Sequence, residues 1–133
     1  MHFSRVSTTH GWQSFIESLG LDPEVLLKSV GLSLDIMSDS DNQIPYLAVA
    51  QLMELSAQET KLEDFGIQLA ARWPSPLQIG GPVGLLMQLM LQSPTVGEAW
   101  QYFCQHYHLH SQGVGWTLDW DHKYAYLIRE GFL

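Results

Sequence analysis

The stretch SPTVGEAWQYFCQHYHLHSQGVGWTLDW, residues 93–120, contains the change of hydrophobic period that decides the fold. In its first half, apolar and aromatic side chains recur at the spacing of one helix face. They are Val96, Ala99, Trp100, Phe103 and Tyr107. After residues 111–113 the pattern alternates instead, as it does in a strand with one buried face. The sequence therefore predicts a helix that leads directly into a strand.

Two start signals lie at the beginning of this helix. Thr95 and Glu98 have the spacing of a capping box, whereas Ser93 followed by Pro94 is the other common way to begin a helix. Both assignments remain open at the level of sequence. With either start, we expect the helix to continue past His110.

A hairpin is predicted after the helix. Val114, Trp116, Leu118 and Trp120 point to one side of the first strand, residues 121–123 form a short turn, and residues 124–130 form the second strand. Within that second strand, one side carries Tyr124, Tyr126 and Ile128. Two strands alone are marginal in water. The hairpin must therefore pack on the helices, pair with another chain or belong to a larger sheet.

Upstream of residue 93 the pattern is helical. The first helix has Trp12, Phe15, Ile16 and Leu19 on one face and ends at Gly20. The second helix is expected to begin with Asp22 as its cap and Pro23 at its first position, and to end at Gly31. Residues 33–43 are rich in serine and aspartate, which predicts a loop.

Three further helices are predicted before residue 93. One begins at Pro45 and buries Val49, Leu52, Met53 and Ser56. A short one carries Phe65, Leu69 and Trp73 along one side. After a loop rich in proline and glycine at residues 74–82, residues 83–92 are apolar on nearly every side, which predicts a central buried helix.

The predicted fold class is α+β, with about six helices followed by an antiparallel hairpin or an incomplete sheet. The chain has 133 residues, about the size of one domain, so residues 1–133 are treated as one unit. A hydrophobic content of 46% is sufficient for a core, and the low charged fraction of 15% leaves apolar surface for a partner.

Charge and composition exclude several classes of protein. The formal net charge is −8, and the six lysines and arginines are scattered, so this chain lacks the basic cluster of a DNA-binding surface. Cys104 is the only cysteine, which excludes an intramolecular disulfide and favours a small buried side chain. The N-terminus lacks the apolar run of a signal peptide, and the apolar stretch at residues 82–91 is about half of a membrane span. We therefore expect a cytoplasmic protein without membrane contact.

The histidines of QHYHLH, residues 105–110, are the first candidates for chemistry. His106 and His110 lie four residues apart, on one side of the predicted helix. A zinc site needs at least three protein ligands, and only the hairpin residues His122, Asp119 or Asp121 could supply more. The interpretations are a structural helix end, the lining of an organic-ligand pocket, or a metal site; we expect no metal and no cofactor.

No catalytic constellation is present. The chain has no GxSxG, SxxK or HExxH motif, and the glycines at positions 80, 81 and 84 do not have the spacing of a phosphate-binding loop. We therefore do not expect an enzyme.

The aromatic hairpin is the second candidate for a site. Trp116, Trp120 and Tyr126 could form one wall of a pocket, or they could simply pack on the helices. Polar groups for such a pocket are available nearby, and Arg72, beside Trp73, is a candidate for binding an anionic ligand. The predicted ligand-binding residues are Arg72, His106, Tyr107, His110, Trp116, Trp120, Tyr126 and Arg129.

Taken in order, four segments resemble the N-terminal effector domain of AraC-type bacterial transcription regulators, in the arabinose-binding variety. They are LGLDPEVLLKSVGL (19–32), QIPYLAVAQLMELSAQET (43–60), DFGIQLA (64–70) and GPVGLLMQLMLQSPTVGEAWQYFCQHYHLHSQGVGWTL (81–118). No single piece is diagnostic, and the resemblance rests on their order and spacing over residues 12–129.

The resemblance implies a cytoplasmic module that senses a small-molecule effector and forms a homodimer. In the family, a pair of helix-turn-helix units follows and reads the DNA, so contact with DNA is expected only through a C-terminal domain that this chain lacks. The chain is also expected to stop short of the full effector domain. The family name does not identify the effector as arabinose. The alternative is an interaction and dimerisation module that binds no ligand.

Overall fold

The computed structural model of the chain describes residues 2–73 and 85–131. Its elements in chain order are β1 (Phe3–Arg5), the 3-10 helix η1 (Val6–Thr9), α1 (Trp12–Ser18), α2 (Pro23–Ser29), α3 (Leu34–Met37), β2 (Gln43–Pro45), α4 (Tyr46–Thr60), α5 (Phe65–Ala71), α6 (Leu85–Met90), α7 (Val96–His106), η2 (Tyr107–Leu109), β3 (Val114–Trp120) and β4 (Ala125–Gly131). The predicted α+β class is confirmed: a mainly helical region precedes an antiparallel hairpin.

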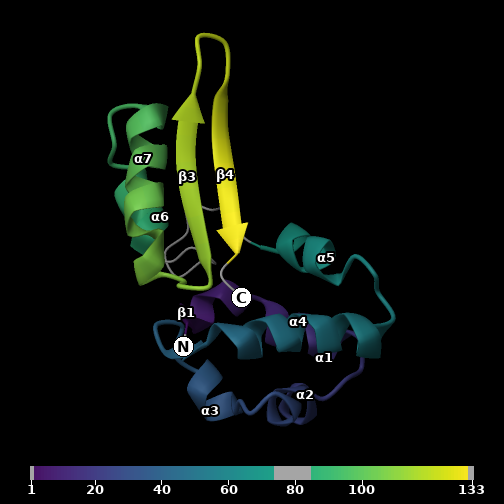
Figure 1. The fold of residues 1–133 in the computed structure, drawn as a ribbon. Helices are drawn as coiled ribbons and strands as arrows, with labels where there is room; N and C mark the ends of the chain where they lie inside the picture. The colour runs from purple at the N-terminus through teal and green to yellow at the C-terminus, as the bar shows by residue number, and fades with distance from the viewer. Residues whose placement is uncertain (1, 74–84, 132–133) are drawn as a thin grey trace.

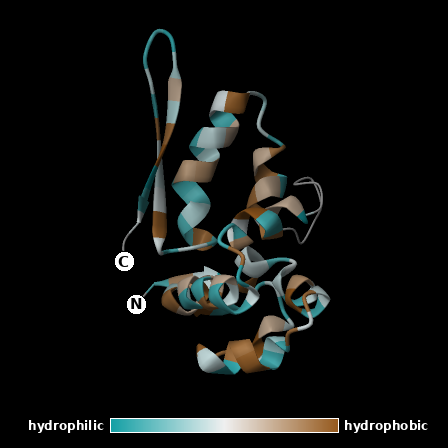
Figure 2. Cartoon of the chain, turned by 90° about the vertical axis from the view of Figure 1, so that its right-hand side faces the viewer, coloured by the Kyte–Doolittle hydropathy of each residue, from teal (hydrophilic) through white to brown (hydrophobic). Residues whose placement is uncertain are grey.

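The described residues form two parts with separate hydrophobic clusters. The N-terminal part runs from β1 to α5, and the C-terminal part comprises α6, α7, η2 and the β3–β4 hairpin (Figure 1). The helices of the N-terminal part lie in a layer below α6 and α7, and the hairpin stands beside α7; a view turned by 90° shows the same layers (Figure 2). The arrangement places residues 3–7 next to the C-terminal part.

The cluster of the N-terminal part contains twelve buried side chains, including Trp12, Phe15, Leu52 and Phe65. The Phe15 and Phe65 rings stack with centroids 5.1 Å apart, and Trp12 Nε1 donates a 2.8 Å hydrogen bond to Ser56 Oγ. The tryptophan therefore buries its ring without leaving its N–H unsatisfied.

The predicted ends of the first two helices are confirmed. Asp22 caps α2 by accepting a hydrogen bond from the Glu24 backbone N–H, and Pro23 takes the first helical position. Gly20 and Gly31 follow α1 and α2 with φ of 81° and 77°, a left-handed conformation that glycine adopts without steric cost.

Two features of the N-terminal part differ from the prediction. Residues 33–43 are not all loop, because Leu34–Met37 form α3, and the Ser33 side chain caps this helix by accepting a hydrogen bond from the Ile36 backbone N–H. Leu19 lies outside the buried stripe, at the C-terminal end of α1, and is 41% exposed. The sequence also gave no sign that Phe3–Arg5 would pair with Gln43–Pro45 in an antiparallel sheet.

The prediction of a central buried helix at residues 83–92 is wrong for the part that the structure describes. Only Leu86 and Met90 of α6 are buried, whereas Leu85 is 70% exposed and Leu91 is 52% exposed. An apolar pattern on every side predicts burial on every side, but among the described elements α6 packs mainly on α7, and its other apolar side chains stay exposed or line a cavity. The predicted loop at residues 74–82 lies outside the described residues.

The start of α7 follows one of the two predicted signals. The Thr95 hydroxyl accepts a 3.1 Å hydrogen bond from the Glu98 backbone N–H, so Thr95 is the cap. Phe103 is buried as predicted, but Val96 is 75% exposed. The α-helix ends at His106 and not beyond His110, because the chain tightens into η2 and then turns toward β1.

The hairpin pairs Val114–Trp120 with Ala125–Gly131 in antiparallel register. Trp116 lies opposite Arg129, and Trp120 lies opposite Ala125, so these four side chains share one face. Tyr126 lies opposite Asp119 on the other face. Every residue of β4 is exposed, whereas β3 packs on α7. The sequence predicts that the hairpin packs on the helices, pairs with another chain or belongs to a larger sheet. The first of these holds for β3, which packs on α7.

Candidate functional site

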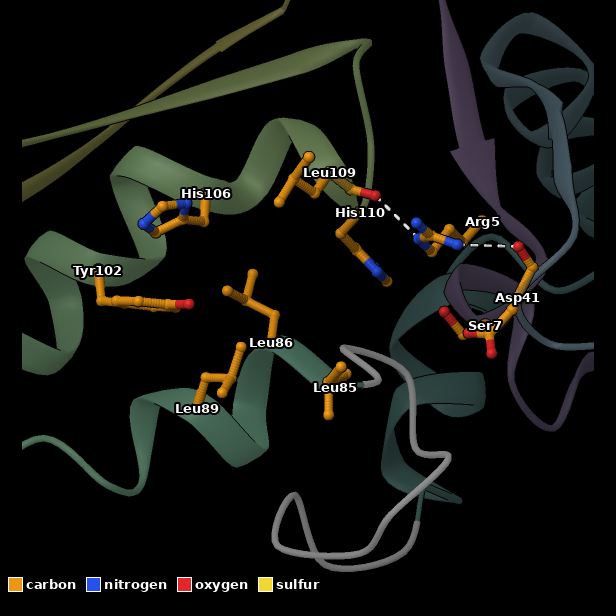
Figure 3. A pocket seen from close by; sticks show the side chains of 10 residues that line it. All are labelled: Arg5, Ser7, Asp41, Leu85, Leu86, Leu89, Tyr102, His106, Leu109 and His110. Atoms are coloured by element: carbon orange, nitrogen blue, oxygen red, sulfur yellow. Dashed lines mark hydrogen bonds between the residues drawn. The ribbon is translucent and has the colours of Figure 1, made fainter.

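The candidate site is a cavity of about 330 Å³ between the two parts of the molecule (Figure 3). One side is formed by residues of β1, η1 and the segment before β2, and the other by residues of α6, α7 and η2. The described lining residues are Arg5, Ser7, Asp41, Leu85, Leu86, Leu89, Tyr102, His106, Leu109 and His110. A volume of this size is at the lower end of the range for small-molecule pockets.

Arg5 is fixed at the edge of the cavity by backbone carbonyls from both parts. Its Nε donates a 2.8 Å hydrogen bond to Leu109 O, and its Nη1 donates a 2.9 Å hydrogen bond to Asp41 O. No carboxylate in residues 2–73 or 85–131 forms an ion pair with Arg5. The guanidinium therefore holds the two parts together and keeps its positive charge without a charged partner.

The backbone around Arg5 forms a seam, which we define as residues 3–5 together with 109–112. The Arg5 backbone N–H donates to His110 O at 2.9 Å, and the Gln112 backbone N–H donates to Phe3 O at 2.7 Å. Ser4 and Ser111 form an isolated antiparallel bridge. Because β1 also pairs with β2, one three-residue strand connects the N-terminal part to the segment that follows η2.

His110 is a buried imidazole beside the cavity, with 6% of its surface exposed. Burial, and secondarily the nearby Arg5 guanidinium, lower the pKa of His110 to about 4. At neutral pH the ring is therefore uncharged. It can donate or accept a hydrogen bond toward the cavity without adding a second positive charge.

The opposite end of the cavity is mostly apolar. Leu85, Leu86 and Leu89 project from α6, and the Tyr102 and His106 rings of α7 lie 4.2 Å apart between their centroids. The polar residues Arg5, Ser7 and Asp41 lie at the other end in Figure 3. The cavity therefore has a polar end and an aliphatic end.

Three buried polar atoms have no hydrogen-bond partner among the described residues: Ser7 Oγ, Ser111 Oγ and Trp116 Nε1. Buried polar groups are usually paired, and leaving one unpaired costs free energy of about 1 to 3 kcal/mol. Ser7 is one of these, and it lines the cavity. Its hydroxyl is available to a molecule bound there.

The structure brings only two of the predicted ligand-binding residues to this cavity, His106 and His110. Tyr107 and Trp116 lie beside it, in the C-terminal cluster, with ring centroids 6.0 Å apart. Burial raises the pKa of the Tyr107 hydroxyl. Arg129 lies opposite Trp116 across the hairpin.

The remaining predicted residues lie elsewhere. Trp120 is 61% exposed near the turn of the hairpin, and Tyr126 is on the other face of the sheet. The Arg72 guanidinium lies over the Phe15 ring, 4.1 Å from its centroid, in the N-terminal part. The structure therefore does not gather the aromatic hairpin residues into one pocket wall.

Sequence reasoning missed Arg5, Ser7, Asp41 and Leu86. They lie far apart along the chain and form no local motif, so only the pairing of β1 with both β2 and residues 110–112 brings them together. One sequence feature could have drawn attention to Arg5: it is a positively charged residue in the short N-terminal segment for which the sequence predicts no helix or strand.

The described residues form neither a metal site nor a membrane-spanning helix. Within residues 2–73 and 85–131, no group of three or more histidine, cysteine, aspartate and glutamate side chains is placed to hold a metal ion. In the same residues, no helix has the length and apolar character needed to cross a membrane.

Comparison with known proteins gives the family. The family model described as the arabinose-binding domain of AraC transcription regulator, N-terminal, matches residues 20–130. A search of the curated proteins found no match. The match covers most of the chain, including β2, α6, α7 and the hairpin that surround or adjoin the cavity. The chain belongs to the arabinose-binding family of N-terminal domains of AraC transcription regulators, which are regulatory ligand-binding domains.

Proposed function

We propose that the cavity between the two parts is the effector site of this regulatory domain. The proposal rests on one observation: both parts of the molecule line the cavity. Arg5 and Ser7 belong to the N-terminal part, and Leu86 and His106 belong to the C-terminal part. A molecule bound there contacts both parts at once. Its binding free energy therefore depends on how they are arranged.

The seam is the element that converts binding into a change of arrangement. Arg5 contacts the cavity and also holds Leu109 O and Asp41 O. A ligand shifts an equilibrium between two arrangements only by its difference in affinity for them. A ligand that engages Arg5 therefore favours the arrangement in which the seam is intact, and the hairpin carries this change away from the cavity.

The output of the domain is proposed to be the geometry of a homodimer. β4 supports this proposal because its outer edge has no strand partner among the described residues and its Tyr126, Leu127 and Ile128 are exposed. We propose that DNA is contacted by an attached DNA-binding domain, since the net charge of this chain is −8. A regulator with this output acts in the cytoplasm.

A thermal-shift screen with a library of metabolites tests the effector site. A stabilising ligand at about a hundred times its dissociation constant adds about 2.7 kcal/mol to the free energy of unfolding. Leu89→Trp fills the cavity and should remove the response, whereas Leu47→Trp, an exposed change on α4, should retain it. A ligand that stabilises both variants equally would place the effector elsewhere.

Analytical ultracentrifugation over a range of concentrations tests the dimer. Ile128→Lys on β4 should shift the chain to a monomer, and Ile67→Lys, the same change on the exposed surface of α5, should not. The alternative function is an interaction module that binds no ligand. It would be favoured by a mass that rises with concentration in a chain that no library compound stabilises.

A further inference from the structure

We propose that the effector is a small amphipathic carboxylate, with its carboxylate at Arg5 and Ser7 and its aliphatic chain against the leucines of α6. This inference rests on the proposed function and names the ligand class of the same cavity. The polar end of the cavity suits the carboxylate, and the aliphatic end suits the alkyl chain.

The polar end presents a fixed cation without a counter-ion. Arg5 uses one Nε–H and one Nη1–H on the carbonyls of Leu109 and Asp41, which fixes the plane of the guanidinium. The remaining N–H donors of the fork are not used in any hydrogen bond to the described residues. A planar fork of donors matches a carboxylate, and an ion pair with such a fork is directional as well as strong.

Ser7 and His110 extend this end of the cavity. The Ser7 side chain is buried, its hydroxyl has no partner among the described residues, and it lies in the same wall as Arg5. His110 is uncharged at neutral pH and lies beside Arg5 and Ser7 in Figure 3. A ligand oxygen that accepts from the Ser7 hydroxyl would satisfy a buried donor that the protein leaves unpaired.

Asp41 is the one acidic residue among the described lining residues, and its backbone carbonyl accepts a hydrogen bond from Arg5. Its side-chain carboxylate forms no ion pair with Arg5. The guanidinium charge therefore remains available to a ligand. A cationic ligand would meet Arg5 at this end and is disfavoured by repulsion.

The aliphatic end is formed by Leu85, Leu86, Leu89 and Leu109 with the Tyr102 ring. The leucine side chains offer no hydrogen bonds, and among the described lining residues only Tyr102 and His106 offer any at this end, so a polyol bound there would leave most of its hydroxyls unpaired at a cost in free energy. An alkyl chain has no hydrogen bonds to lose there, and burying its apolar surface away from water lowers the free energy of binding. The same wall that favours a fatty chain therefore disfavours a sugar such as arabinose.

The first experiment uses the unmodified chain and isothermal titration calorimetry. Hexanoate, hexanol, hexylamine and L-arabinose are compared at one pH and low ionic strength, at concentrations where none forms micelles. We expect hexanoate to bind at least tenfold more tightly than hexanol and hexylamine, and its affinity to fall as salt is added. Equal binding of hexanoate and hexanol, or tighter binding of arabinose, would overturn the inference.

Variants then locate the carboxylate. Arg5→Gln should weaken hexanoate about tenfold and leave hexanol unchanged, whereas Lys28→Gln, which removes an exposed positive charge from α2, should change neither. Arg5 also supports the seam, so Ser7→Ala provides a second variant that breaks no hydrogen bond in the described residues. It should weaken hexanoate several-fold with hexanol unchanged, and unaltered hexanoate binding in both Arg5→Gln and Ser7→Ala would refute the assignment.

The outcomes separate this inference from the function on which it rests. If a different ligand stabilises the chain and Leu89→Trp abolishes that response, the cavity is an effector site and only the carboxylate class is wrong. If hexanoate and every library compound fail to bind, both the inference and the effector site are refuted.

Discussion

His110 shows how one buried side chain gives the domain a pH dependence. Its pKa is lowered to about 4, mainly because burial disfavours the charged imidazole and secondarily because Arg5 repels it. In the unfolded chain the pKa is about 6.5. Between these values the unfolded chain binds a proton that the folded chain does not bind.

We therefore predict that the contribution of His110 to the free energy of unfolding is fully present well above pH 6.5 and is lost, by about 2 to 3 kcal/mol, as the pH is lowered toward 4. Urea unfolding of the chain at pH 7.0, 5.5 and 4.5 measures this. His110→Leu should reduce the loss over this window, and His108→Leu, at an exposed position two residues away, should not. An undiminished pH dependence in His110→Leu would show that another group is responsible.

Gly113 is a residue whose lack of a side chain is required by its neighbour. A Cβ added there would overlap the Tyr46 ring, which packs on the glycine backbone where the chain enters β3. We predict that Gly113→Ala lowers the free energy of unfolding by about 1 to 3 kcal/mol, the usual range for overpacking.

Chemical denaturation checks the prediction, with Gly97→Ala in α7 as the matched control. An added Cβ at Gly97 meets nothing within 4 Å, so that variant should be neutral or slightly more stable. If Gly113→Ala is as stable as the unmodified chain, the close packing of Tyr46 is not maintained in solution.

At the scale of elements, α7 shows how a local signal fixes a helix start. Thr95 and Ser93 both qualified as caps from the sequence, and the structure has the Thr95 hydroxyl bonded to the Glu98 backbone N–H. We predict that Thr95→Ala lowers the free energy of unfolding by about 1 kcal/mol. Ser93→Ala should change it by a few tenths at most, and both values are obtained from urea titrations. A larger loss in Ser93→Ala would reverse the assignment of the cap.

The hairpin turn is fixed by Asp121. Its Oδ1 accepts hydrogen bonds from the Lys123 and Tyr124 backbone N–H groups at 2.8 and 2.7 Å, and these amides lower the pKa of the carboxyl. The turn sets the register, and the register decides that Trp116 faces Arg129 while Tyr126 points to the opposite face. The hairpin is therefore well defined although β4 buries almost nothing.

At the scale of the whole molecule, the two parts differ in how much core they contain. Among the described residues, the N-terminal part has a cluster of twelve buried hydrophobic side chains, whereas the cluster of the C-terminal part has three, Leu86, Met90 and Phe103. Local opening requires less free energy where fewer apolar contacts are lost. The C-terminal part should therefore open while the N-terminal part remains folded.

Hydrogen–deuterium exchange with mass spectrometry tests this prediction. Amides in peptides from α4 should exchange at least tenfold more slowly than amides in β4. Phe103→Ala should accelerate exchange in α7 and the hairpin and leave α4 unchanged, whereas Phe65→Ala should accelerate exchange in α4. Uniform acceleration by both variants would mean that the two parts unfold as a single unit.

The sequence by itself determined the features that depend on neighbours along the chain. Helical spacing placed Trp12 and Phe15 in the core, the Asp22–Pro23 pair gave the start of α2, and alternation after residue 113 gave β3. These signals are local because capping and periodicity involve residues within a few positions of one another. The order of the segments was also sufficient to indicate the family, which the match over residues 20–130 shows.

Only the tertiary structure decided the burial of α6, the end of α7 and the composition of the cavity. Leu85 is exposed because, among the described residues, α6 packs mainly on α7, and the α-helix stops at His106 because residues 109–112 meet β1. Arg5 and His110 become neighbours through backbone hydrogen bonds that join residues about a hundred positions apart. Pairing at that separation depends on the path of the whole chain, and no local pattern of side chains records it.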